Sequence, residues 1–281
     1  MVKAKVKKPS FRRKNAIKPK AKFPLGKSIL VLVLILFSIM AYHYRDAISF
    51  YINSKRNSGT TIDKVAQARI HQVLTKHEDK TFGFDVSEYQ GEINWKEIDS
   101  VEHKFPLHFV FIRATAGKDK VDSWFKTDWN STKKHHLIRG AYHYYRPNEN
   151  SIAQADNFIR TVSLQKGDLP PILDIEQMPE SQSIAKLKIG LKRWLDRVES
   201  HYKIKPIIYS GERYYSDFLR DEFSEYSFWI ANYNFFEENI KDDWLFWQFT
   251  EKAVVEGIYE NVDLNIFNGT PIMLKQFTKS K

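Results

Sequence analysis

The sequence of 281 residues contains no cysteine. A disulfide, a thiolate zinc site and a cysteine nucleophile are therefore excluded, whereas the cellular compartment stays open. Acidic residues are also missing from residues 1–27, which hold eleven Lys or Arg between Lys3 and Lys27. The remaining chain carries 33 basic and 34 acidic residues, so the formal net charge of +10 resides in this tail. The near-neutral remainder does not favour a nucleic-acid-binding face, and no nucleic-acid partner is expected.

Charged side chains are absent from Ser28 to Tyr44, a run of 17 residues that is almost wholly apolar. A bilayer is spanned by about 20 such residues, with a lower limit of about 17. The positive-inside rule places the basic tail, residues 1–27, in the cytoplasm. We therefore expect a single transmembrane helix at residues 28–44. The chain after about residue 45 should lie outside the cytoplasmic membrane, in the periplasm or at the cell surface.

A cleaved signal peptide is the alternative interpretation of this apolar run. Cleavage after Ala41 would place Ile39 where a small residue is needed, and no A-x-A pattern lies nearby, so an uncleaved anchor is favoured. Residues 45–80 are predicted to be a stalk. Apolar residues recur at helical intervals between Ile62 and Leu74, which predicts a short amphipathic helix there. The main domain is expected at residues 81–281.

Short apolar runs alternate with helix-like segments throughout the main domain. Such alternation predicts β/α units and a parallel sheet. Eight strands predict an α/β fold, an irregular β/α barrel of the TIM-barrel type, in which the last helices are short or missing. The predicted strands are residues 82–86, 107–114, 139–145, 171–176, 205–210, 228–233, 244–249 and 262–267. The predicted helices are residues 94–101, 122–136, 151–165, 181–203 and 211–221.

Acidic residues fall near the predicted strand ends. The run ILDIE, residues 172–176, places Asp174 and Glu176 two residues apart, so both point to the same face of a strand. Asp85 lies near the end of the first strand and Asp263 lies in the last. Barrels of this type build their active site at the carboxyl ends of the strands, so these four acids are expected at one mouth. A strand-end Asp often caps the next helix, but a cap would need only one of the ILDIE acids.

Crowding of these acids has a chemical consequence. Carboxyl groups that lie close together repel, so one of them should have a raised pKa and hold a proton near neutral pH. We expect Glu176 to be that group. Glycoside hydrolysis needs such a proton donor for the leaving oxygen, together with a negative group that stabilises an oxocarbenium-like transition state.

A set of motifs runs through the main domain in a fixed order: FGFDVSEYQGEINW, FVFIRATAG, VDSWFKTDWNSTKKHHLIRGAYHYYRP, ILDIE, IIYSG, FWIANY, FWQF and NVDLN. From about residue 81 to residue 268 this set resembles the family 25 glycoside hydrolases, the lysozymes sometimes called the Chalaropsis type. Each motif alone is weakly specific, whereas the ordered set is highly specific. One departure is visible, because the family often has a Glu after the Thr of its second-strand motif and this chain has Ala116.

The resemblance implies an N-acetylmuramidase, which cleaves the β-1,4 bond between N-acetylmuramic acid and N-acetylglucosamine in peptidoglycan. The implied fold is an irregular β/α barrel that uses no metal or organic cofactor. By position, Glu176 matches the general acid and Asp174 the partner that stabilises the acetamido group or the charged intermediate, whereas Asp85 and Asp263 match the other acids. Acetamido assistance would retain the configuration without a covalent enzyme intermediate. The groove is expected to be lined by Tyr142, Tyr144, Tyr209, Trp247 and Gln248.

Two other functions are compatible with these residues. Strand ends of the D-x-E type also serve hydrolases of other N-acetylglucosamine polymers, such as chitin. A catalytically silent wall-binding module on a membrane anchor is the second alternative, and the intact acids argue against it. The sequence therefore favours a membrane-anchored peptidoglycan hydrolase.

Overall fold

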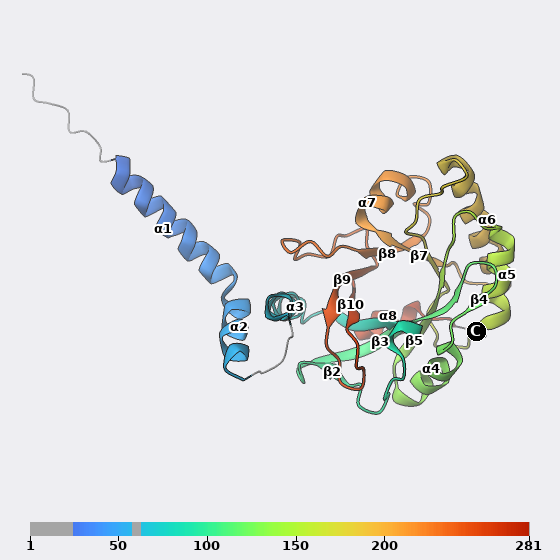
Figure 1. Cartoon of the computed structure of the whole chain (residues 1–281), viewed down its shortest axis with the longest axis horizontal. Coiled ribbons are helices and arrows are strands. Elements are labelled where there is room, and N and C mark those ends of the chain that lie inside the picture. Colours follow the sequence, from blue (N-terminus) through green and yellow to red (C-terminus); the bar gives the residue numbers. More distant parts are fainter. Residues whose placement is uncertain (1–24, 58–62, 281) are drawn as a thin grey trace, which may run out of the picture. The chain divides into compact units, whose positions relative to one another are not determined.

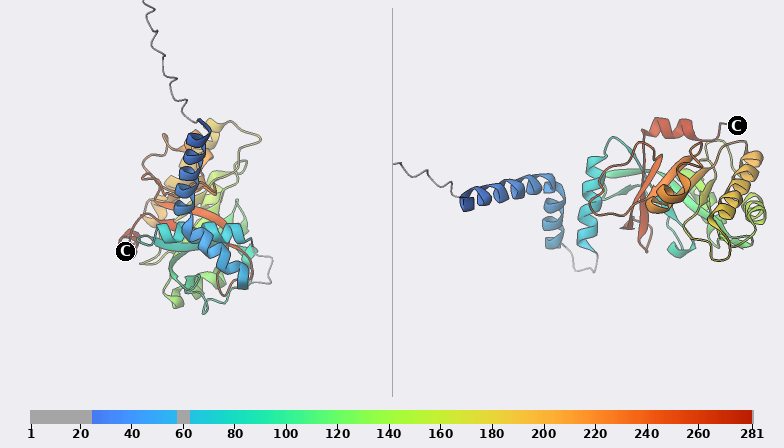
Figure 2. Two further views of the ribbon diagram at one scale, coloured as in Figure 1. Left: turned by 90° about the vertical axis from the view of Figure 1, so that its left-hand side faces the viewer. Right: turned by 90° about the horizontal axis from the view of Figure 1, so that it is seen from above.

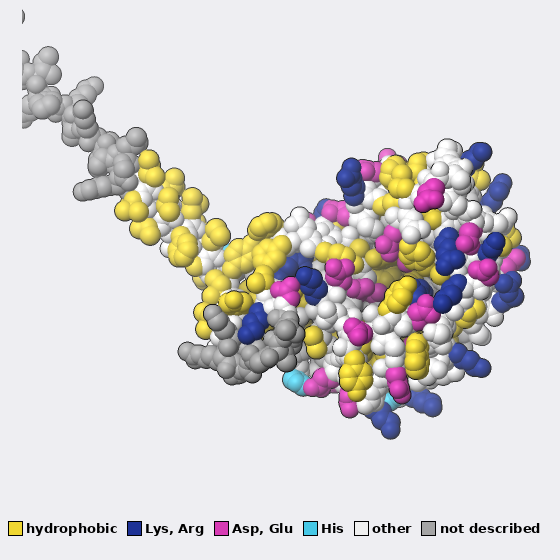
Figure 3. Space-filling model, viewed as in Figure 1, with side chains coloured by type: hydrophobic (Ala, Val, Ile, Leu, Met, Phe, Trp, Pro, Cys, Tyr) yellow, Lys and Arg dark blue, Asp and Glu magenta, His cyan; other side chains and the backbone are white. Residues whose placement is uncertain are grey.

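The computed structural model describes residues 25–57 and 63–280. Nearly all of the basic tail therefore lies outside the described residues. The chain divides into two compact units, Met1–Arg45 and Asp46–Lys281. The described part of the first unit is the helix α1 (Leu25–His43), whose apolar side chains from Ile29 to Met40 are exposed (Figure 3).

The expected single transmembrane helix of residues 28–44 is not confirmed. Within the described ranges, no single helix is both long and apolar enough to cross a bilayer. Ser28–His43 and Arg45–Asn53 satisfy that criterion only as a pair, which is interrupted at Tyr44.

The second unit begins with two helices, α2 (Arg45–Asn57) and α3 (Lys64–Lys76). Asp63 caps α3 by accepting a hydrogen bond of 3.1 Å from the backbone N–H of Ala66. The amphipathic helix predicted near residues 62–74 is thus confirmed, but the stalk assignment of this segment is wrong. α3 buries Ile70, Val73 and Leu74 and lies against β9, so it belongs to the barrel domain (Figure 1).

Eight strands close into a barrel. Their order around the barrel is β1-β10-β9-β8-β7-β6-β5-β3, and the pairing of β3 with β1 completes the ring. The predicted α/β barrel is therefore confirmed. The strands are β1 (Thr81–Val86), β3 (Phe105–Ala116), β5 (Ile138–Tyr144), β6 (Ile172–Asp174), β7 (Ile207–Gly211), β8 (Ser227–Ala231), β9 (Phe246–Ala253) and β10 (Val262–Phe267). Two further short strands, β2 (Ser100–Val101) and β4 (Lys120–Val121), pair antiparallel with the two ends of β3.

The last strand departs from the expected parallel sheet. β10 runs antiparallel to both of its neighbours, β1 and β9, whereas the other seven barrel strands are mutually parallel. Only residues 254–261 connect β9 to β10. A parallel return needs a crossover of about a dozen or more residues, so this short connection forces a hairpin.

Helices cover the outside of the barrel between the early strands. α5 (Ser151–Thr161) and α6 (Ile184–Tyr202) lie side by side on the outside of the barrel (Figures 1 and 2). The side chains of Asn150 and Ser183 cap their N-termini. The remaining helices are α4 (Phe125–Thr132), α7 (Glu212–Tyr214), which continues as a π-helical turn (Tyr215–Leu219), and α8 (Pro271–Phe277). As expected, the connections that follow β8 and β9 contain no helix.

The helix predicted at residues 94–101 is wrong. This segment forms a turn followed by the short strand β2, and it is anchored to other elements of the barrel domain. The backbone N–H of Asn94 donates to the carbonyl of Gly257 at 2.8 Å. The indole N–H of Trp95 donates to Asp128 Oδ1 at 3.1 Å. Tertiary contacts therefore override the local helical pattern.

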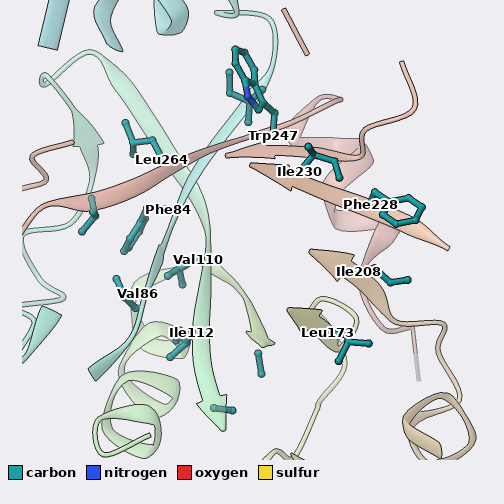
Figure 4. Close-up of a cluster of buried hydrophobic side chains, with 14 of the residues drawn as sticks. Phe84, Val86, Val110, Ile112, Leu173, Ile208, Phe228, Ile230, Trp247 and Leu264 are labelled. Atoms are coloured by element: carbon teal, nitrogen blue, oxygen red, sulfur yellow. The ribbon is translucent and has the colours of Figure 1, made fainter. Parts of the chain in front are cut away.

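Two cores follow from the alternation of strand side chains. The outer core lies between strands and helices and includes Phe84, Val86, Val110, Ile112, Leu173, Ile208, Phe228, Ile230, Trp247 and Leu264 (Figure 4). The inner core fills the barrel with aromatic rings, among them Phe109, Phe111 and Phe246. Gly83 makes room for this filling, because a Cβ there would lie 2.5 Å from the ring of Phe109.

Candidate active site

The four predicted acids come together at one end of the barrel. Asp85 is the penultimate residue of β1 and Asp174 is the last residue of β6. Asp263 lies at the start of β10, and the antiparallel direction of that strand makes it the direct cross-strand partner of Asp85. Glu176 follows β6 and is exposed to solvent. Figure 3 shows acidic side chains beside hydrophobic ones in the middle of this face.

Asp85 is held by two amide side chains. Gln248 Nε2 and Asn265 Nδ2 each donate to its Oδ2 atom at 2.7 Å. The hydroxyl of Tyr209 donates to Gln248 Oε1 at 2.7 Å, so the amide of Gln248 must turn its N–H toward Asp85. Trp229 Nε1 orients Asn265 in the same way by donating to its Oδ1 at 2.8 Å.

Asp85 and Asp263 form the first of two carboxyl pairs. Burial is the main cause that raises the pKa of Asp85 to about 7, against hydrogen bonds from Asn265 and Gln248 that lower it. Burial, followed by the charge of Asp85, raises the pKa of Asp263 to about 9. Asp263 therefore keeps its proton at neutral pH and donates it to Asp85 in a hydrogen bond.

Asp174 and Glu176 form the second pair. Asp174 is buried, and its Oδ1 atom has no hydrogen-bond partner within the described residues. Burial, followed by the charge of Glu176, raises the pKa of Asp174 well above its usual value. Partial loss of hydration at the mouth also raises the pKa of Glu176, but a hydrogen bond with Asp174 opposes that rise. Both shifts favour a proton shared within this pair, and the assignment of that proton to Glu176 stays a prediction.

Of the predicted groove residues, the three tyrosines lie near Asp174, whereas Trp247 does not. Tyr209 and Tyr144 are the cross-strand neighbours of Asp174 on its two sides, and Tyr142 belongs to the inner core just below. Trp247 is the exception, because its side chain is completely buried in the outer core and its indole N–H donates to the carbonyl of Asn232. Its prediction as a substrate contact is therefore wrong.

Three residues at the mouth were not predicted as site residues. Asn265 lies two residues after Asp263, and the period of a strand could have placed both on one face. Tyr233 donates its hydroxyl to the same oxygen of Gln248 as Tyr209 does. Arg113 forms a salt bridge with Asp122, with 3.0 Å between Nε and Oδ2, and its positive charge lowers the pKa of Asp174. No local sequence signal marks these last two.

This arrangement has the parts of an acid catalyst for acetal cleavage. A proton is held between an exposed carboxyl group and a buried one, and a second carboxyl pair lies beside them. A preorganised, partly water-excluded site strengthens each of these electrostatic effects on a developing positive charge. The described residues contain no cluster of three or more His, Asp or Glu with metal-binding geometry.

Comparison with known proteins decides the family. The model for glycosyl hydrolases family 25 matches residues 84–258. The chain belongs to this family. It is therefore a glycoside hydrolase whose catalytic domain is a family 25 barrel.

Several relatives of this family 25 enzyme span most of its length. An uncharacterized protein, YegX of Escherichia coli, is 34% identical over 261 residues, which cover 89% of this chain and 93% of YegX. Lysozyme M1 of Streptomyces globisporus is 30% identical over 68% of this chain and 69% of its own. The solved family 25 glycosyl hydrolase of Bacillus anthracis superposes with a TM-score of 0.63 at 28% identity, covering 72% of this chain and 95% of that one.

The raised carboxyl pKa values predict an unusual pH dependence of stability in this family 25 domain. Folded Asp263 keeps its proton up to a pKa of about 9, whereas an unfolded Asp titrates near pH 4. The folded chain then binds more protons between these values, so the free energy of unfolding falls as pH rises. In Asp263→Asn, which keeps a donor to Asp85, this fall should be shallower between about pH 5 and about pH 8.

Urea unfolding across this pH range measures the effect. The exposed residue Asp119 supplies the control, because Asp119→Asn should leave the pH dependence of the wild type unchanged. An Asp263→Asn curve parallel to that of the wild type would show that Asp263 does not retain its proton.

Proposed function

We propose that this family 25 enzyme is an N-acetylmuramidase that hydrolyses the β-1,4 bond between N-acetylmuramic acid and N-acetylglucosamine in peptidoglycan. The observation that carries the proposal is the pair Asp174 and Glu176, which holds a shared proton at the exposed end of β6. Relatives named lysozyme, among them Lysozyme M1 and an autolytic lysozyme of Clostridium acetobutylicum, support this substrate class.

Glu176 is the proton donor in this proposal. The side chain of Glu176 is exposed and can contact the glycosidic oxygen of a bound substrate. The side chain of Asp174 is only 4% exposed, which makes it the less accessible proton donor of the two. A proton that moves from Asp174 across their hydrogen bond to Glu176 can pass to the glycosidic oxygen as the bond to the anomeric carbon breaks. Asp174 is then negatively charged, and it faces the sugar at the moment that positive charge develops there.

The substrate's own acetamido group supplies the nucleophile. Its carbonyl oxygen attacks the anomeric carbon from the face opposite the leaving oxygen, and the resulting oxazolinium cation is stabilised by Asp174. Water then opens this ring while Glu176 accepts a proton, so two inversions give net retention. Proton NMR of the first products should show the β-anomer, and an initial α-anomer would contradict acetamido assistance.

Replacing Glu176 tests the catalytic assignment. Glu176→Gln cannot donate the proton, so the rate of release of new reducing ends from purified peptidoglycan should fall by about 10²–10⁴-fold. Because Glu176 is exposed, the unfolding midpoint should change little. Glu180→Gln, which alters an exposed Glu in the same connection, is the matched control and should keep wild-type activity.

The products separate this proposal from its alternative. Mass spectrometry should identify N-acetylmuramic acid at the new reducing ends. Faster release of sugar from chitin than from peptidoglycan would favour the chitinase alternative, and full activity in Glu176→Gln would remove Glu176 from the mechanism.

We also propose that the N-terminal segment tethers the enzyme to the cytoplasmic membrane with the barrel domain outside. The apolar, exposed surface of α1 and the basic residues that precede it in sequence support this orientation. The location suits the substrate, because peptidoglycan lies beyond that membrane.

Cell fractionation tests the tether. The full-length chain should remain in the membrane fraction after carbonate extraction. Protease added to cells whose wall has been removed and whose cytoplasmic membrane is intact should digest the barrel domain. A mature chain that begins near residue 42 would instead identify a cleaved signal peptide.

A further inference from the structure

Arg69 joins the N-terminal helix α3 to the connection between β8 and β9. Its guanidinium group is buried and donates to backbone carbonyls, namely to Phe249 at 2.6 Å, to Asn234 at 2.8 Å and to Phe235 at 3.3 Å. A buried, charged donor that satisfies several carbonyls at once fixes the backbone that carries them. Arg69 therefore holds the connection that carries Tyr233 and Phe235 against α3.

Further polar contacts reinforce this junction. Gln67 Nε2 donates to the carbonyl of Lys252 at 2.7 Å, and the ammonium group of Lys252 pairs with Asp63 at 3.0 Å. Gln72 Nε2 donates to Glu238 Oε1 at 2.8 Å. α3 precedes the residues that match the family model.

A cleft opens between the N-terminal half of α3 and this connection. Its volume is about 430 Å³, which lies in the range of sites for small ligands. Two of its aromatic side chains are open to solvent, since Tyr233 is 42% and Phe235 is 43% exposed. Thr250, Glu251 and Lys252 supply polar groups along the β9 side.

The cleft shares Tyr233 with the catalytic mouth. Tyr233 lines the cleft, and its hydroxyl donates to Gln248, which in turn donates to Asp85. Glu251 lines it as well, and its charge contributes to the raised pKa of Asp263. The cleft is therefore linked to the catalytic acids through Tyr233 and Glu251.

We propose that this cleft is a subsite for one sugar ring of the glycan strand, beyond the two sugars joined by the bond that is cut. The proposal rests on the peptidoglycan hydrolase function above. A sugar ring presents an apolar C–H face and a rim of hydroxyl groups, and the cleft offers Tyr233 and Phe235 beside Thr250, Glu251 and Lys252. Arg69 keeps the aromatic platform in place.

Phe235→Ala tests the subsite by its dependence on substrate length. The KM for long glycan strands should rise about tenfold, the loss expected for one aromatic contact, whereas the KM for the shortest oligosaccharide that is cleaved should rise less than about twofold. Phe236→Ala is the matched control, because Phe236 is 77% exposed in the same connection and does not line the cleft. It should leave both KM values unchanged.

Three outcomes would overturn the subsite. The KM could be unchanged in Phe235→Ala for long strands, or it could rise equally for long and short substrates. The effect could also vanish on glycan strands stripped of their peptides, which would make the occupant a peptide stem. In each case the wild type still cleaves peptidoglycan, so the proposed function stands, whereas a wild type that releases no reducing ends would refute that function first.

Discussion

The insertion of β10 between β1 and β9 is the interaction on which the mouth of the barrel depends. This strand closes the ring, and its antiparallel direction brings its first residues to the end where the parallel strands finish. Asp263 thereby meets Asp85, and Asn265 pairs with Gln248 across the strands. Both amides then donate to one oxygen of Asp85. A parallel last strand would have put these side chains at the opposite end.

The aromatic filling of the barrel explains why the acids above it hold protons. The ring of Phe111 lies 4.5 Å from that of Trp229, which in turn lies 4.2 Å from Tyr209. These rings exclude water below the carboxyl groups, and burial is the leading cause of every raised carboxyl pKa at the mouth. Trp229 connects the inner core to the carboxyl groups at the mouth, because its ring packs in that core and its indole N–H donates to Asn265.

The barrel and the acids of β1 and β6 could be predicted from the sequence because they depend on local patterns, whereas the place of Asp263 at the mouth depends on the antiparallel direction of β10. The two-residue period of ILDIE agrees with the structure, in which Ile172 belongs to the inner core and Leu173 to the outer core. Pairings between distant segments could not be predicted in this way. The direction of β10 depends on its neighbours, and α3 was taken for a stalk because Arg69 finds its carbonyl partners about 165 or more residues away. Trp247 and Gln248 are adjacent in sequence, and only the strand's orientation decides which of them faces the mouth.

The position of β10 has a consequence for the order in which the catalytic centre is assembled during synthesis. Asp85 is made long before Asp263, so the ring stays open and the first carboxyl pair incomplete until β10 has left the ribosome. Long-range pairings of this kind form late, because a large loop must close before they contribute any stability. A nascent or truncated chain therefore lacks a finished catalytic centre. Activity then arises only after β10 has been made and has closed the ring.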